Sequence, residues 1–212
     1  MTITALEKTK GDRYTVYIDG EYWYILDLEI LLQNHVRKDM EVDEEFLDDL
    51  LVQAERRKAR ERAYYLLGYR DHSAKELYDK LVKNARPEIA AEIVALMQEQ
   101  GYINDEDYAG KLARYYLQSK RWGARKTLFE MTRRGIDRET AQLAIEECSV
   151  DYVEQLRQII DRKYAQYLND GDYKGKQKVI AALTRLGYSY SDIKTAIGGY
   201  LSADNDEDEY YD

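Results

Sequence analysis

The spacing of hydrophobic positions along the chain changes near residue 27. Before it, three runs are rich in Thr, Tyr, Val, Ile and Trp, a composition typical of strands: Ile3–Lys8, Arg13–Ile18 and Glu21–Ile25. Asp19-Gly20 separates the second and third runs, and this dipeptide favours a two-residue hairpin, in which both positions need a positive φ. The pattern predicts a small N-terminal β-hairpin element of two or three strands over residues 1–26, which leans on the following helices because it is marginal alone.

Apolar residues then recur with the spacing of a helix. Asp27 can cap a short helix, and Asp43 can cap a second one whose first turn is acidic, which suits the positive end of the helix dipole. The second helix can continue through the charged stretch Glu55–Arg62 towards Leu67. We expect a helical linker region over residues 27–57.

A motif of about fifty residues then occurs three times. Its copies are shifted by 50 residues and then by 52. The corresponding positions are Ser73, Leu77, Leu81, Lys83 and Ala85 in the first repeat, Gly123, Thr127, Met131, Arg133 and Gly135 in the second, and Gly175, Val179, Leu183, Arg185 and Gly187 in the third.

Each repeat reads as three helices with short connectors. Ser73-Ala74-Lys75-Glu76 has the form of a capping box, in which serine and glutamate each accept from a free backbone N–H. We expect a mostly α-helical array of three tandem three-helix repeats, over residues 58–104, 105–149 and 150–201. Arrays of this kind present a long surface to a partner, which favours a binding protein over an enzyme.

Composition narrows the class of protein. A single proline permits long helices, and the lone Cys148 excludes an intramolecular disulfide. Charged residues interrupt the N-terminal apolar run, so it does not read as a signal peptide, and no uncharged apolar stretch is long enough for a membrane span. We therefore expect a soluble cytoplasmic protein that does not interact with membranes.

Charge is distributed unevenly. The formal net charge is −9, yet the last nine residues hold six acidic side chains; we expect a disordered acidic tail over residues 202–212. The stretch from Gly110 to Arg138 contains nine basic residues and only two acidic ones. Such a local basic field attracts an anionic partner even on an acidic protein.

Signals for catalysis, cofactors or metals fail when their spacing is checked. Gly171–Gln177 resembles a phosphate-binding loop but is one residue short and lacks the Ser or Thr that would bind magnesium. Asp204, Asp206 and Asp208 alternate like a calcium loop, but the required glycine is missing. His35 and His72 belong to no spaced ligand set. The sequence predicts no catalytic residue, no cofactor and no metal.

The 21 tyrosines have two interpretations. They can stack on the bases of a single-stranded nucleic acid, or they can pack their rings at helix ends and faces with the hydroxyl in water. We favour packing for tyrosines at such places, for example Tyr64, Tyr65, Tyr69, Tyr102, Tyr108, Tyr115, Tyr116, Tyr164 and Tyr167.

The motifs of the repeats resemble those of RecX regulatory proteins over roughly residues 1–201. The resemblance is carried by four stretches: Arg13–Glu21; Ala63–Leu81, with its Leu67-Gly68-Tyr69-Arg70; Gly101–Asp105 with Tyr108-Ala109; and Gly123-Ala124-Arg125 followed by Arg133-Arg134-Gly135-Ile136. Two positions depart from the family pattern, since Ala124 stands where proline is common and Ala85 where glycine is usual.

This resemblance implies an elongated, curved array that lies in the groove of the RecA nucleoprotein filament. It also implies inhibition of ATP hydrolysis, strand exchange and filament extension, and hence a role in recombination, DNA repair and the SOS response. We expect a monomer. Two alternatives stay open, a helical protein that binds single- or double-stranded DNA directly and a non-catalytic scaffold.

For the contact with the filament we predict the basic face of the second repeat and equivalent turns of the others. Arginine's planar fork suits carboxylates and phosphates. Trp122 is interpreted as a buried residue of a helix junction rather than an anchor at the interface. The predicted contact residues are Lys83, Arg114, Lys120, Arg121, Arg125, Lys126, Arg133, Arg134 and Arg185. The opposing interpretation is that some of these side chains only solvate a helix face or pair with Glu130 and Asp137.

Overall fold

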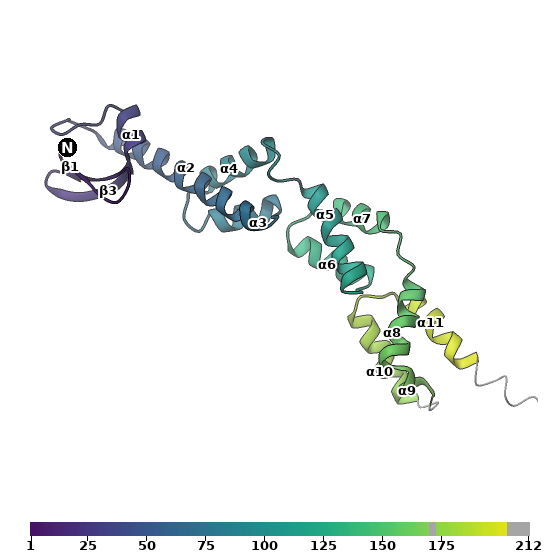
Figure 1. Cartoon of the computed structure of the whole chain (residues 1–212). Coiled ribbons are helices and arrows are strands. Elements are labelled where there is room, and N and C mark those ends of the chain that lie inside the picture. The colour runs from purple at the N-terminus through teal and green to yellow at the C-terminus, as the bar shows by residue number, and fades with distance from the viewer. Residues whose placement is uncertain (170–172, 203–212) are drawn as a thin grey trace, which may run out of the picture. The chain divides into compact units, whose positions relative to one another are not determined.

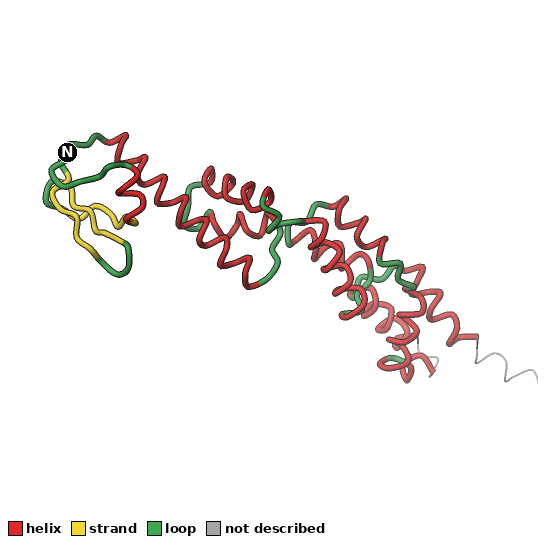
Figure 2. Tube along the Cα trace, turned by 45° about the horizontal axis from the view of Figure 1, so that its top comes forward, coloured by secondary structure: helices red, strands yellow, loops and turns green. Residues whose placement is uncertain are grey.

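The computed structural model describes residues 1–169 and 173–202 and divides into two compact units (Figure 1). Unit 1 comprises Met1–Asp71 and Leu77–Ile103. Unit 2 comprises His72–Glu76 and the chain from Asn104 onward. The strands gather at the N-terminal end, and the elements that follow in the described chain are helices joined by loops (Figure 2).

Unit 1 begins with a three-stranded antiparallel sheet in the order β1-β2-β3. The strands are β1 (Ile3–Lys8), β2 (Arg13–Ile18) and β3 (Glu21–Asp27). At the β2–β3 turn Asp19 has φ +51° and Gly20 φ +89°, which confirms the predicted hairpin. The sheet shares a core with the next two helices, in which Ile3, Val16 and Leu50 are fully buried. This core is the support that such a small sheet needs.

Four helices begin in the first hundred residues: α1 (Leu28–Gln33), α2 (Glu44–Tyr69), α3 (Ala74–Leu81) and α4 (Pro87–Glu99). Asp43 caps α2 as predicted, since its carboxylate accepts from the Phe46 N–H at 2.8 Å. The capping role expected of Asp27 is wrong. This residue precedes α1 without a capping hydrogen bond, and its carboxylate lies 3.3 Å from the Arg57 guanidinium instead.

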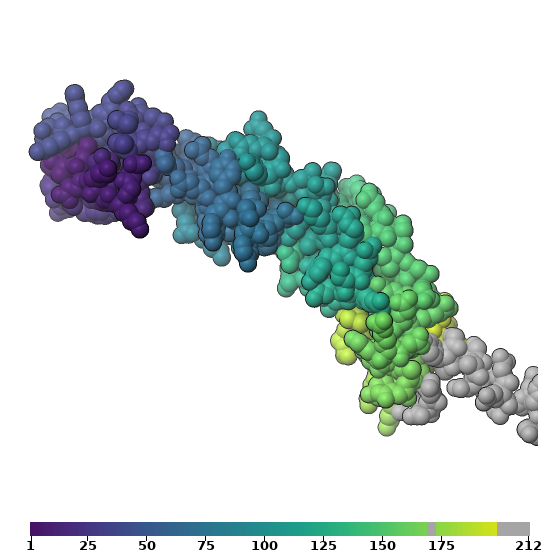
Figure 3. Space-filling view, viewed as in Figure 1, coloured from purple at the N-terminus to yellow at the C-terminus, as the bar shows by residue number. Residues whose placement is uncertain are grey.

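Unit 2 holds the second and third repeats. The second comprises α5 (Asp105–Arg114), a π-helical turn η1 (Tyr115–Ser119), α6 (Ala124–Arg133) and α7 (Arg138–Glu147). The third comprises α8 (Tyr152–Lys163), α9 (Ala165–Asn169), α10 (Tyr173–Arg185) and α11 (Tyr190–Ser202). Each has its own core, with Met131 central to one and Leu183 to the other. Their surfaces meet directly in the space-filling view (Figure 3).

Two positions of the motif are buried in every repeat, and only Thr127 among these six residues is polar. Leu77, Thr127 and Val179 are buried, and so are Leu81, Met131 and Leu183. Gly171, the first residue of the stretch that resembles a phosphate-binding loop, and nearly all of the predicted acidic tail lie outside the described residues. No helix within the described ranges is both long and apolar enough to span a membrane.

The tyrosines divide into two groups. Tyr108 and Tyr116 are buried, as the packing interpretation predicts. For Tyr65 and Tyr69 that interpretation is wrong, since 68% and 86% of these residues are exposed. Both rings lie on a face of α2 that is exposed towards the C-terminal end of the helix.

Candidate anion-binding cleft

The second and third repeats meet through backbone atoms. The Gly123 N–H donates to the Leu186 carbonyl at 2.8 Å, and the Arg125 N–H donates to the Gly187 carbonyl at 3.1 Å. A Cβ on Gly123 would lie 2.3 Å from the Gly187 carbonyl carbon. Gly187 has φ +93°, a conformation that side chains rarely adopt. Glycine is therefore required on both sides of this junction.

The turn that follows η1 is held from both repeats. Arg121 has φ +54°, and the next residue, Trp122, donates its N–H to the Tyr116 carbonyl at 3.0 Å and stacks its ring on Tyr116 at 4.8 Å. From the third repeat, the Tyr188 hydroxyl donates to the Arg121 carbonyl at 3.0 Å. Gln155 donates to the Leu117 carbonyl at 2.7 Å. These contacts fix the backbone that presents Lys120 and Arg121, and they agree with Trp122 as a junction residue.

Beside this junction lies a cavity of about 600 Å³, which we call the basic cleft. Its walls come from the turn after η1, from α6, and from the C-terminal ends of α8 and α10. Six of the lining residues are basic and none is acidic. The lining residues are Ser119, Lys120, Arg121, Lys126, Ile159, Arg162, Lys163, Tyr164, Ala182, Arg185 and Leu186.

The positive charge of the cleft is not neutralised within the described part of the chain. None of its six cations forms an ion pair with a described residue. Lys126 places its ammonium 4.0 Å from the centre of the Trp122 ring, and Lys120 lies 5.4 Å from that of Tyr115. Cations gathered in a concave site concentrate the field there, so the cleft is suited to phosphates or carboxylates.

Four of the nine predicted contact residues line this cleft: Lys120, Arg121, Lys126 and Arg185. Arg125 is exposed beside a second, mainly apolar cavity of about 350 Å³ under α6 and α7. Arg114 is exposed at the end of α5. Lys83 is exposed in the turn after α3, in unit 1. Their contact with a partner stays a prediction.

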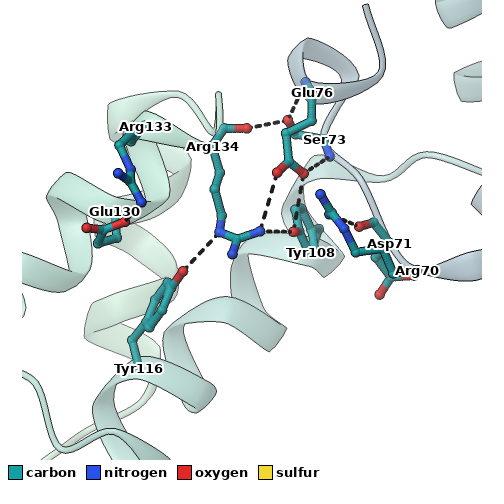
Figure 4. Close-up of polar contacts among 9 residues, drawn as sticks. All are labelled: Arg70, Asp71, Ser73, Glu76, Tyr108, Tyr116, Glu130, Arg133 and Arg134. Atoms are coloured by element: carbon teal, nitrogen blue, oxygen red, sulfur yellow. Dashed lines mark hydrogen bonds and ion pairs between the residues drawn. The ribbon is translucent and has the colours of Figure 1, made fainter. Parts of the chain in front are cut away.

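Arg133 and Arg134 are engaged within the protein (Figure 4). Arg133 pairs with Glu130 at 2.7 Å, as the opposing interpretation expected. The Arg134 guanidinium lies 3.3 Å from the Glu76 carboxylate and donates to the Tyr108 and Tyr116 hydroxyls at 3.0 and 2.9 Å. Burial, the largest single effect, lowers the pKa of Arg134, but these partners together raise it above its ordinary value. Arg134 therefore joins the start of α3 to the second repeat within unit 2.

The sequence reasoning missed Arg162 and Lys163, the two cleft cations at the end of α8. They follow Ile159, also in the cleft wall, by three and four residues, so helical spacing places them on its side of the helix. This helical spacing is the feature of the sequence from which Arg162 and Lys163 could have been predicted. Nowhere in the described ranges do three or more His, Cys, Asp or Glu side chains gather as they would to hold a metal ion.

Comparison with known proteins gives family models for all three repeats. Residues 59–95 match "RecX, first three-helix domain", residues 104–145 the second domain and residues 150–197 the third. The Regulatory protein RecX of Bacillus subtilis (strain 168) is 26% identical over 98% of this chain and 79% of its own length. That of Caldanaerobacter subterraneus subsp. tengcongensis is 28% identical over 93% of this chain and 98% of its own length.

Two solved structures have the same fold. A crystal structure of regulatory protein RecX aligns with a TM-score of 0.67 at 23% identity, covering 92% of this chain and 98% of the other. RecX from Lactobacillus salivarius aligns with a TM-score of 0.63 at 24% identity, covering 70% and 97%.

Proposed function

The chain belongs to the RecX family of regulatory proteins, and from this premise we propose that it binds the RecA filament on DNA and restrains it through the basic cleft. The observation that carries the proposal is the set of six cations without described carboxylate partners, held on a backbone junction between two repeats. A filament of protein on DNA presents phosphates and acidic side chains, and both complement such a site.

The chemistry of the cleft favours binding over catalysis. Its lining offers cations, a serine, a tyrosine and aliphatic side chains. These groups can hold an anion between two repeats and thereby resist rearrangement of the filament. Slower ATP hydrolysis, strand exchange and filament extension by RecA would follow from that restraint, without any reaction carried out by this chain.

The proposed contact surface has a centre and a periphery. At the centre are the six cleft cations. Arg114, Arg125 and Lys83 are peripheral candidates because their side chains are exposed outside the cleft. Arg133 is a weaker candidate because Glu130 already pairs with it. We assign Arg134 to the internal network rather than to the surface.

The test is ATP hydrolysis by RecA on single-stranded DNA while this protein is titrated in. One variant removes three cleft cations, Arg121→Ala, Lys126→Ala and Arg185→Ala. A matched control removes three exposed cations of unit 2 that neither line the cleft nor belong to the predicted contacts, Arg138→Ala, Arg157→Ala and Lys194→Ala.

Wild-type protein is expected to inhibit hydrolysis. The cleft variant should need at least about tenfold more protein for half inhibition, since three charge contacts worth about 0.5–1 kcal/mol each are lost. The control should stay within about twofold of wild type. Unchanged hydrolysis at saturating wild-type protein would contradict filament restraint. Equal loss in both variants would contradict the assignment to the cleft.

A further inference from the structure

One face of α2 changes character along its length. Positions 47, 51, 54, 58, 62, 65 and 69 follow one another at intervals of three and four residues, so they share a face of the helix. Leu47 and Ala54 are buried in the core shared with the sheet. Beyond them the same face continues as Lys58, Arg62, Tyr65 and Tyr69, which we call the aromatic stripe. All four are exposed.

Cations contact rings along this face. The Arg62 guanidinium lies 5.1 Å from the centre of the Tyr65 ring and has no ion-pair partner in the described chain. Where the sheet ends, Lys58 donates to the Tyr24 hydroxyl at 3.0 Å and lies 4.5 Å from the centre of its ring. Tyr64, on another face of α2, instead packs on Tyr102, with 5.4 Å between ring centres.

We propose that the aromatic stripe binds single-stranded nucleic acid, with bases stacked on Tyr65 and Tyr69 and phosphates held by Arg62 and Lys58. Two exposed rings next to cations match a strand in which bases and phosphates alternate, and such stacking is tolerant of sequence. The stripe presents no aliphatic side chain or carboxylate among its four members, so it suits bases and phosphates better than an apolar protein surface.

This site goes beyond the proposed function. The stripe lies in unit 1, whereas the basic cleft lies in unit 2. Binding of nucleic acid to the aromatic stripe needs no recombinase, so it can be tested on this protein alone.

The probe is a fluorescent oligothymidylate of about 16 nucleotides, with affinity measured by anisotropy. The double variant Tyr65→Ala with Tyr69→Ala is expected to bind at least about tenfold more weakly, because stacking contributes about 1–3 kcal/mol per base. The double variant to Phe should stay within about twofold of wild type, because stacking uses the ring and not the hydroxyl. Tyr22→Ala removes a tyrosine of similar exposure, 61%, that is not part of the stripe, and should have no effect.

Salt dependence separates the two roles within the stripe. Arg62→Ala should lower the slope of log affinity against log salt by about 0.7, the share of one phosphate contact on a single strand. The double alanine variant should weaken binding and leave that slope unchanged. A smaller slope in the tyrosine variant would overturn the stacking assignment.

Crosslinking locates the strand directly. With 5-iododeoxyuridine in the oligonucleotide, irradiation should join it to Tyr65 or Tyr69, both in wild type and in the variant that lacks three cleft cations. Crosslinks confined to the cleft, or full affinity of the double alanine variant, would overturn the proposal. The proposal would also be overturned if the variant with Tyr65→Ala and Tyr69→Ala lost RecA inhibition but bound the oligonucleotide normally. The stripe would then contact protein and not nucleic acid. The anisotropy and crosslinking readouts do not depend on whether RecA is restrained.

Discussion

The two junctions inside unit 2 use equivalent positions of the repeat and different chemistry. At the first junction the Ser73 hydroxyl donates to the Arg134 carbonyl. At the second the Gly123 N–H donates to the Leu186 carbonyl. Ser73 corresponds to Gly123, and Arg134 corresponds to Leu186. The same acceptor position is therefore reached by a side chain in one case and by the backbone in the other.

Both junctions are closely packed, since a Cβ on Gly135 at the first would lie 2.4 Å from the Lys75 Cβ, and the difference is that the first adds a polar network. Near Ser73, the Arg134 side chain contacts the Glu76 carboxylate and two tyrosine hydroxyls. The first junction therefore depends on partly buried charge. Among the described residues no such charge network lies at the second junction, and its backbones approach too closely for a Cβ at either Gly123 or Gly187. Loss of the Arg134 network should therefore weaken the first junction moderately, whereas a Cβ at Gly123 or Gly187 should disrupt the second because it meets backbone atoms.

The most damaging single change should be Gly187→Ala. Its Cβ would lie 2.4 Å from the Lys126 backbone nitrogen at a residue with φ +93°, so strain and a clash with backbone combine. We expect a loss of about 3 kcal/mol in the free energy of unfolding of unit 2. Urea denaturation can follow Trp122 in a Trp23→Phe background, which leaves a single tryptophan, placed at this junction.

Gly110→Ala is the matched control for the same assay in unit 2. Gly110 lies in α5, its φ is not positive, and a Cβ there would lie 3.5 Å from the Arg114 guanidinium, an ordinary van der Waals distance. Alanine should be neutral or stabilise α5 by up to about 1 kcal/mol. Equal destabilisation by both substitutions would contradict the steric account of the second junction.

An intermediate effect is expected from Arg134→Ala at the polar junction. It removes the Arg134 ion pair from Glu76, whose side chain is only 17% exposed, and a donor from two tyrosine hydroxyls. We expect a loss of about 2 kcal/mol in the same urea assay. Its neighbour gives the control, because Arg133 is 68% exposed and paired only with Glu130. Arg133→Ala should change stability by less than about 0.5 kcal/mol, and a similar loss in both variants would contradict the network's role.

Local chemistry made parts of this structure predictable. The Asp19-Gly20 turn, the cap at Asp43 and the capping box from Ser73 to Glu76 each depend on neighbours within a few residues. The capping box is confirmed in both directions, since the Glu76 N–H donates to the Ser73 hydroxyl at 3.0 Å and the Ser73 N–H to the Glu76 carboxylate at 3.4 Å. The repeat period also identified the core, because equivalent positions are buried in each repeat.

Contacts between distant residues were not predictable in the same way. Four cleft cations came from the motif and the basic stretch, but Arg162 joins them only because α8 and α10 converge on the turn after η1. Arg133 and Arg134 are adjacent in sequence, yet only the second reaches Glu76, 58 residues away. Composition likewise could not distinguish buried Tyr116 from exposed Tyr69, because burial depends on which helix packs beside each ring.

Of the three junction substitutions, Tyr188→Phe at the second junction is expected to have the smallest effect on stability at neutral pH. The variant keeps the buried ring and removes the hydroxyl that contacts the Arg121 carbonyl and Gln155, at a cost of about 1 kcal/mol. Burial raises the pKa of Tyr188, with a smaller contribution from Tyr152, while Arg121 opposes the rise.

Because the folded state holds this phenol proton more tightly than the unfolded state, the contribution of Tyr188 is complete below pH 10, the ordinary pKa of tyrosine, and declines as pH rises further. The decline can reach about 1.4 kcal/mol per pH unit. The wild-type advantage over Tyr188→Phe should therefore shrink above pH 10 and vanish near pH 11, measured by urea denaturation across this range. Tyr190→Phe removes an exposed hydroxyl and should show no such convergence. A difference between wild type and Tyr188→Phe that stays constant from pH 8 to pH 11 would contradict a buried, protonated Tyr188 at the junction that supports the basic cleft.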